Sequence, residues 1–178
     1  MGRTVTQHNR WRMKEGLTDA ELGWAAGILD GEGCIGIYGR AGRRTDGGLG
    51  LHALVSVGNT DFRMILKLKD LFGGNISSLQ RDSRPNRRAA ITWRTSGRHA
   101  GRVLERVLPF LVVKREQAEV ALAFIATMRM GGRLSQEVKD ERDHLRTKAQ
   151  SLKRFDFSER QDVVLEFGRR SKQGASGG

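Results

Sequence analysis

The feature that most constrains this chain is a run of small and apolar residues that stops on an acid between two glycines, WAAGILDGEG at residues 24–33. Ahead of it, Thr18 and Glu21 have the spacing of a capping box, so we expect a helix to begin directly after Thr18. The glycines around Glu32 predict that this helix ends abruptly, with a carboxylate at its tip.

The two sides of this expected helix differ in bulk. Gly23, Ala26, Gly27 and Asp30 are three or four residues apart and align on one side. Small residues there would let a second helix approach closely. The opposite side carries the residues that would seat the helix on a core, namely Leu22, Trp24, Ala25, Ile28 and Leu29.

Residues 25–33 resemble the signature of the LAGLIDADG homing endonucleases, and a strand at 34–40 follows, as it does in that family. The resemblance continues along the chain in the family's order. The motif occurs once in this sequence. Family members with one copy act as homodimers, so the resemblance implies a homodimer joined through Gly23, Ala26, Gly27 and Asp30.

Hydrophobic patterning predicts an α+β fold. Residues 50–58 alternate, with Leu51, Ala53, Val55 and Val57 on one face, and further strands are expected at 33–40, 75–80 and 88–95. Helices are expected at 62–72, 97–107, 114–128, 135–152 and 158–167. The resulting αββαββα core has a four-stranded antiparallel saddle sheet, with helices on one face and C-terminal helices after it. One domain would span 1–168, with its core at 17–130, C-terminal helices at 135–168 and a flexible tail at 169–178.

The charge balance indicates a polyanionic partner. The 178 residues include 32 Lys and Arg against 20 Asp and Glu, a formal net charge of +12. Ribosomal and membrane-surface proteins are also basic, so charge alone does not decide the partner. The single cysteine, Cys34, excludes a disulfide framework. No signal peptide or membrane-spanning run is evident, so we expect an intracellular protein without a membrane partner.

Glu32 is the main catalytic candidate. The resemblance implies that Glu32 and the Gly31 carbonyl hold Mg²⁺, or another divalent cation such as Mn²⁺ or Ca²⁺, for phosphodiester hydrolysis. The family more commonly has Asp at this position. The alternative is that Glu32 is a solvated acid after a helix. Asp30 is interpreted as a structural residue that caps or pairs at the dimer seam.

Two further positions match the family's catalytic pattern. Asn59 follows the second strand, where the family often has a polar residue that orients attacking water, commonly Gln. The alternative is an ordinary cap or turn residue. Lys114 lies in LPFLVVKREQA (residues 108–118), which resembles the segment that carries a charge-stabilising lysine. It could instead simply begin an exposed helix.

The sheet face away from the helices is predicted to read double-stranded DNA in the major groove. The candidates on the strands and their turns are Tyr38, Arg40, Arg43, Arg44, His52, Ser56, Arg81, Arg84, Arg87, Arg88, Thr92 and Arg94. Trp93 and Ile91 would face the core, although a register slip by one residue would exchange the two sets. Some of the turn arginines could be merely solvated. Basic residues near the C-terminus, including Lys148 and Lys153, could contact the DNA backbone or form a solvated helix face.

The leading hypothesis is a homodimeric, Mg-dependent homing endonuclease that makes double-strand breaks in a long, roughly palindromic DNA site, in the context of intron homing. The alternative is a non-cleaving nucleic-acid binder on the same scaffold, either an intron RNA maturase or a transcription regulator. The presence of Glu32 and Lys114 favours the enzyme.

Overall fold

The computed structural model describes residues 11–40, 50–78, 90–128 and 134–153. The predicted α+β class and element order are confirmed. The elements are α1 (Asp19–Glu32), β1 (Gly33–Arg40), β2 (Gly50–Asn59), α2 (Phe62–Phe72), β3 (Asn75–Ser78), β4 (Ile91–Ser96), α3 (Gly97–Val107), the 3₁₀ helix η1 (Leu108–Phe110), α4 (Arg115–Ala126) and α5 (Gln136–Ser151).

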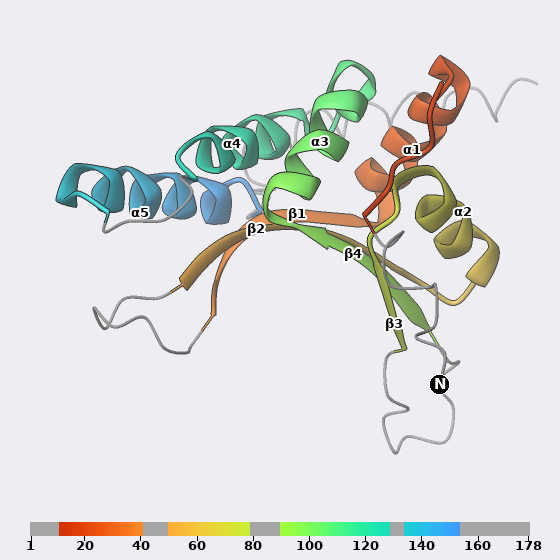
Figure 1. Cartoon of the computed structure of the whole chain (residues 1–178), viewed down its shortest axis with the longest axis horizontal. Coiled ribbons are helices and arrows are strands. Elements are labelled where there is room, and N and C mark those ends of the chain that lie inside the picture. Colours follow the sequence, from red (N-terminus) through yellow and green to blue (C-terminus); the bar gives the residue numbers. More distant parts are fainter. Residues whose placement is uncertain (1–10, 41–49, 79–89, 129–133, 154–178) are drawn as a thin grey trace, which may run out of the picture.

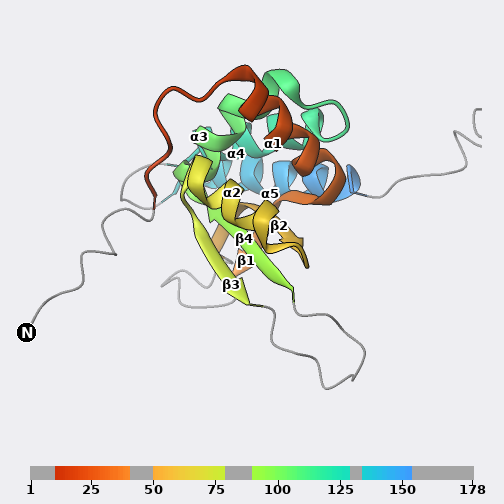
Figure 2. The same ribbon diagram turned by 90° about the vertical axis from the view of Figure 1, so that its right-hand side faces the viewer.

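The four strands form one antiparallel sheet in the order β1-β2-β4-β3. Each hairpin pairs neighbouring strands, and β2 pairs with β4 to join the two hairpins at the centre. Figure 1 shows the sheet arched beneath the helices, which all lie over its convex side. The concave side is left open, and Figure 2 shows the same layering from the side.

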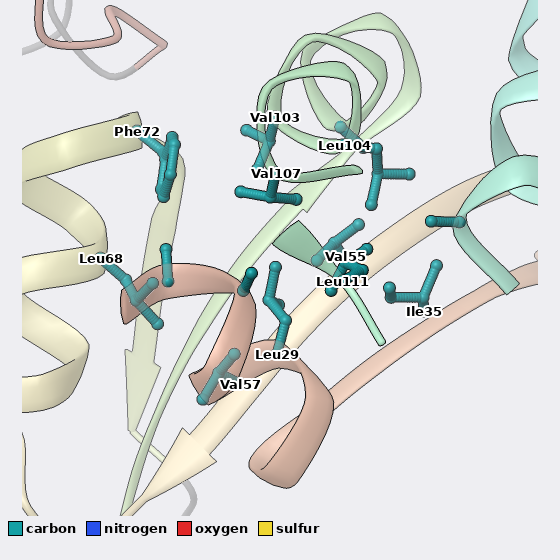
Figure 3. Packing of buried hydrophobic residues seen from close by; sticks show 14 of the residues in the cluster. Leu29, Ile35, Val55, Val57, Leu68, Phe72, Val103, Leu104, Val107 and Leu111 are labelled. Carbon is teal, nitrogen blue, oxygen red and sulfur yellow. The ribbon is translucent and has the colours of Figure 1, made fainter. Parts of the chain in front are cut away.

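Alternating side chains bind the sheet to the helices. Ala53, Val55 and Val57 of β2 are fully buried, as is Trp93 of β4. The main core brings together Leu29 of α1, Val55 and Val57 of β2, Leu68 and Phe72 of α2, and Val103, Leu104 and Val107 of α3, as Figure 3 shows. The predicted register was therefore correct, and Thr92 and Arg94 lie on the opposite face from Trp93.

A second, smaller cluster fixes α5 on the β1 end of the sheet. Ala149 of α5 packs with Ile37, Ala53, Val120 and Phe124. Within the described ranges, no helix is long and apolar enough to cross a bilayer. The helix predicted at 158–167 and the tail at 169–178 lie outside the described residues.

Element boundaries differ slightly from the predictions. Strand β4 begins at Ile91 rather than at residue 88. Helix α4 begins at Arg115 and ends at Ala126, so Lys114 is its N-cap rather than its first helical residue. The capping box of Thr18 and Glu21 is confirmed, since the Thr18 side chain accepts from the Glu21 amide and the Thr18 amide donates to the Glu21 carboxylate.

Candidate functional site

The site begins where α1 runs directly into β1. Glu32 is the last residue of α1 and Gly33 is the first of β1, with no loop between them. Gly31 and Glu32 are both exposed. Within the described part of the chain, the Glu32 carboxylate has no hydrogen-bond or ion-pair partner. An acid is therefore presented to solvent at a rigid junction.

Gly33 makes this junction possible. Its N–H donates to the carbonyl of Leu29, which closes the last turn of α1. A Cβ at Gly33 would lie 2.5 Å from the Leu29 carbonyl oxygen and 2.8 Å from the Leu29 Cα. Both are backbone atoms and cannot swing aside, so the junction needs glycine for space.

We expect Gly33→Ala to lower the free energy of unfolding by about 1–3 kcal/mol, as overpacking a rigid site does. The measurement is urea denaturation. Gly58→Ala is the matched control, because a Cβ there would come no closer than 3.4 Å to another atom, the Thr92 Oγ1, which is an ordinary contact. That control should change the free energy of unfolding by under about 1 kcal/mol, since it adds no clash and only reduces backbone freedom. Equal losses in both variants would contradict the steric explanation.

Asp30 ties the end of α1 to the segment that leads into α4. Its Oδ2 accepts from the Val112 amide at 2.8 Å, and its Oδ1 accepts from the Lys114 amide at 2.8 Å. Both carboxylate oxygens are thus used within the same protomer. These contacts support the structural interpretation of Asp30.

Lys114 completes this connection from the other side. Its ammonium donates to the carbonyls of Leu29 at 2.9 Å and Asp30 at 2.5 Å. A cation at the C-terminal end of a helix complements the helix dipole and can hydrogen-bond its last carbonyls. Two of the three ammonium donors are occupied by these carbonyls, so one is left for another acceptor.

Replacing Asp30 with Asn should destabilise this connection by about 1–3 kcal/mol, because one of the two backbone amides would lose its acceptor. Chemical denaturation would measure the loss. Asp19→Asn, an exposed acid in the first turn of α1, is the control and should cost under about 1 kcal/mol. If Asp30→Asn unfolds at the same denaturant concentration as the control, the connection contributes nothing measurable.

Asn59 ends β2 next to the same junction. Gly33 pairs with Val57, which places the end of β2 beside the start of β1. The Asn59 Oδ1 accepts from the Asp61 amide at 2.7 Å, so Asn59 forms a turn that leads into α2. Asp61 caps α2, and hydrogen bonds from Arg63 lower its pKa to about 2.

The open face of the sheet presents a continuous set of side chains in register. Tyr38 pairs with His52, Cys34 with Ser56, and Ser56 with Arg94. Each of these pairs lies opposite the buried face of its strands, so the predicted readers Tyr38, His52, Ser56, Thr92 and Arg94 share one surface. The backbone of Arg40 continues β1. Arg43, Arg44, Arg81, Arg84, Arg87 and Arg88 lie outside the described residues.

The exposed face of α1 differs in one respect from the prediction. Ala26 is fully buried in the core, so its assignment to an interface was wrong. The exposed face of α1 instead carries Gly27 and Gly31. Both are exposed, and a Cβ added at either would meet nothing within 4 Å. A Cβ added at Gly23 would lie 3.9 Å from the Phe110 Cδ1, so Gly23 faces the 3₁₀ helix η1 of its own protomer. The spacing of the small residues alone did not show which of them pack against the core.

Sequence reasoning undervalued two features beside this site. Val112 and Val113 are 82% and 72% exposed where the chain passes the end of α1. Two adjacent valines before Lys114 were a visible signal of an apolar surface. The other feature is Lys153, which follows α5 and reaches the open face of β1. Glycine at position 36, in the middle of a strand, was the available signal of a close approach.

The oxygen donors at the junction suit a hard divalent cation. Across the described ranges, no group of three His, Cys, Asp or Glu side chains could hold a metal by itself. The Glu32 carboxylate and the Gly31 carbonyl present oxygen atoms, the donor type that Mg²⁺ prefers. Mg²⁺ also keeps waters and takes substrate phosphates alongside one or two carboxylates, so a single exposed Glu fits it.

No protein-family model matches the sequence, and no curated protein matches it. Solved structures do. I-CvuI, in complex with an I-CreI target in the presence of 2 mM Mg and with the DNA not cleaved, gives a TM-score of 0.62 at 22% identity, over 75% of this chain and 82% of that one. The archaeal intron-encoded I-Vdi141I, complexed with DNA, gives 0.63 at 14% identity, over 84% and 98%. The LAGLIDADG homing endonuclease I-LtrWI, bound to target DNA, gives 0.54 at 18% identity, over 77% and 46%.

These similarities define the class of fold: an α+β architecture that occurs in homing endonucleases. The chain has, in particular, the LAGLIDADG fold, as the resemblance at residues 25–33 predicted.

Proposed function

We propose that this protein is a site-specific DNA endonuclease that hydrolyses phosphodiester bonds with the help of a divalent cation. The observation that carries the proposal is the exposed Glu32 carboxylate at the α1–β1 junction, beside an open, arched sheet. The fold it shares with DNA-bound endonucleases supports this choice. The net charge of +12 agrees with a DNA partner.

The active assembly is a homodimer formed through α1. The exposed glycines Gly27 and Gly31, with Gly23 beside them, allow two α1 helices to approach at backbone distance. Such a pairing brings two Glu32 carboxylates side by side, one for each DNA strand. Asp30 supports this interface through its bonds to the Val112 and Lys114 amides.

Within each centre, Glu32 and the Gly31 carbonyl would hold the divalent cation, with Mg²⁺ as the expected ion and Mn²⁺ or Ca²⁺ able to occupy the same ligands. The bound cation would supply charge stabilisation at the phosphate and a more acidic water. The free donor of the Lys114 ammonium stabilises negative charge on the phosphate, and the Asn59 amide orients the attacking water. Glu32 sits at the tip of a helix and is therefore positioned without a mobile loop.

Recognition belongs to the concave face of the sheet. Tyr38, His52, Ser56, Thr92 and Arg94 share that surface and would reach base edges and phosphates in the major groove. The proposal also counts Arg40 and the turn arginines predicted as readers among the DNA contacts. A two-fold dimer would read a long, roughly palindromic site.

A second candidate is a non-cleaving nucleic-acid binder, either an intron RNA maturase or a transcription regulator. Lys114 and Asn59 both make structural contacts, the first to the end of α1 and the second to the turn before α2. Their presence is therefore explained without catalysis, which leaves Glu32 as the residue that separates the two functions.

Cleavage of a plasmid library of randomised target sites in the presence of Mg²⁺ tests the proposal. The endonuclease predicts linear plasmids that share one sequence motif. Tight binding of DNA or RNA without any cutting, under the same conditions and with Mn²⁺, would favour the second candidate and overturn the first.

A further inference from the structure

Lys153 lies on the open face of the sheet although it follows a helix of the opposite layer. Its ammonium donates to the Tyr38 hydroxyl at 2.5 Å and lies 4.4 Å from the centre of the Tyr38 ring. It is also 3.6 Å from the Cys34 sulfur. Tyr38 and Cys34 are residues of β1 that face away from the core.

The position of β1 at the edge of the sheet explains how Lys153 reaches the open face. Helix α5 packs on the helix side of the sheet, where Ala149 belongs to the same buried cluster as Ile37 and Ala53. β1 is the outer strand on this side of the sheet, so the segment after α5 can pass around its edge. Lys153 follows α5, and its side chain reaches Tyr38 on the open face.

Gly36 leaves the space that the end of the Lys153 side chain occupies. A Cβ at Gly36 would lie 2.5 Å from the Lys153 Nζ and 3.0 Å from its Cε. Gly36 is buried although it belongs to the open face, because the lysine side chain covers it. The absence of a side chain at Gly36 therefore makes room for Lys153.

The ammonium keeps its charge available. Lys153 is exposed, and no carboxylate contacts it among the described residues. Burial raises the pKa of the Tyr38 hydroxyl, so Tyr38 remains neutral and does not cancel the positive charge. An ammonium has three donors, so one remains beyond those directed at Tyr38 and Cys34.

Lys153 also lies in line with other recognition residues. Cys34, next to the ammonium, pairs with Ser56, and Ser56 pairs with Arg94. This row crosses the sheet from the β1 edge, with a cation near each end. Two cations on one row match the regular negative charge of a nucleic-acid backbone.

We infer that Lys153 is a DNA-contacting residue, held over Gly36 by Tyr38 and bound to a backbone phosphate at the β1 edge of the recognition face. The inference rests on the proposed DNA-binding function. A compact point charge at the rim of a surface suits a phosphate, whereas base edges are read by planar or bidentate groups. Lys153 therefore contributes affinity that does not depend on base sequence.

The test is the salt dependence of DNA binding by the full chain, measured on a duplex of arbitrary sequence. Lys153→Met should lower the slope of log K against log salt by about 0.9 per protomer, the value for one lost phosphate contact. Lys148→Met is the matched control. Lys148 lies on α5, and its Nζ is 3.6 Å from the Glu116 Oε1, so its charge is paired with a carboxylate. That control should keep the wild-type slope.

Gly36→Ala provides a second route to the same result. The added methyl would lie 2.5 Å from the Lys153 Nζ and 3.2 Å from the Tyr38 Cε2, so the flexible end of the lysine is displaced while the fold should persist. Its slope should match that of Lys153→Met, and the double variant should lose no more than either single variant. If Lys153→Met binds with the wild-type slope, the inference is overturned while the proposed function stands. If the wild-type chain shows no salt-dependent DNA binding, both are overturned.

Discussion

Glu32→Gln should lower the rate of DNA cleavage about 1000-fold or more while leaving DNA binding within about twofold of wild type. The amide removes the charged ligand for the cation, whose charge stabilisation is worth several kcal/mol, and each 1.4 kcal/mol is a factor of ten in rate. Glu32 is exposed and has no partner among the described residues, so its neutralisation should not disturb the fold. Single-turnover cleavage of the selected plasmid site, with binding measured in parallel, provides the comparison.

Glu32→Asp is the matched control for this prediction. It keeps the charged oxygen ligand on a side chain one methylene shorter, and it should retain cleavage far above that of Glu32→Gln. Wild-type cutting by Glu32→Gln would remove this side chain from the mechanism. A parallel loss of binding and cutting would show instead that Glu32 positions the DNA.

The second large effect concerns assembly. Gly27→Gln should convert the protein to a monomer and lower double-strand cleavage by about 100-fold or more, since small displacements of catalytic groups have effects of that size. Within the protomer nothing lies within 4 Å of a Cβ at Gly27, so the longer side chain clashes only with an approaching partner. Sedimentation and cleavage of the same samples measure the two effects.

Thr147→Gln is the control for added bulk, because Thr147 is an exposed residue of α5. It should leave both the sedimentation and the cleavage of the wild type unchanged. Far-ultraviolet circular dichroism should show that Gly27→Gln keeps its helices, because replacing glycine inside a helix is favourable by about 0.5–1 kcal/mol. A variant that sediments and cuts like wild type would rule out α1 as the interface.

Much of this fold could be predicted because its signals are local. The capping box of Thr18 and Glu21 fixed the start of α1, and the alternation of Ala53, Val55 and Val57 fixed the buried face of β2. Once β2 is oriented, pairing with β4 requires Trp93 to face the core and Arg94 to face away. Local geometry therefore determined which candidates share the recognition surface.

The remaining features depend on contacts between distant parts of the chain. The Asp30 carboxylate binds the Val112 and Lys114 amides, 82 and 84 residues away. Lys153 meets Tyr38 across 115 residues. Ala26 illustrates the same limit, because helical spacing places it beside Gly27 but only the packed core shows that it turns inward.

The absence of any linker between α1 and β1 has a geometric consequence for the proposed dimer. Gly33 caps α1 and is also the first residue of β1, so in that dimer the axis that relates the subunits and the plane that meets the DNA would keep a constant mutual angle. The distance between the two half-sites of the DNA target would then be set by the backbone geometry at Gly33. Adaptation to new sequences would proceed by exchanging side chains on the strands, while the length of the recognised site stays the same.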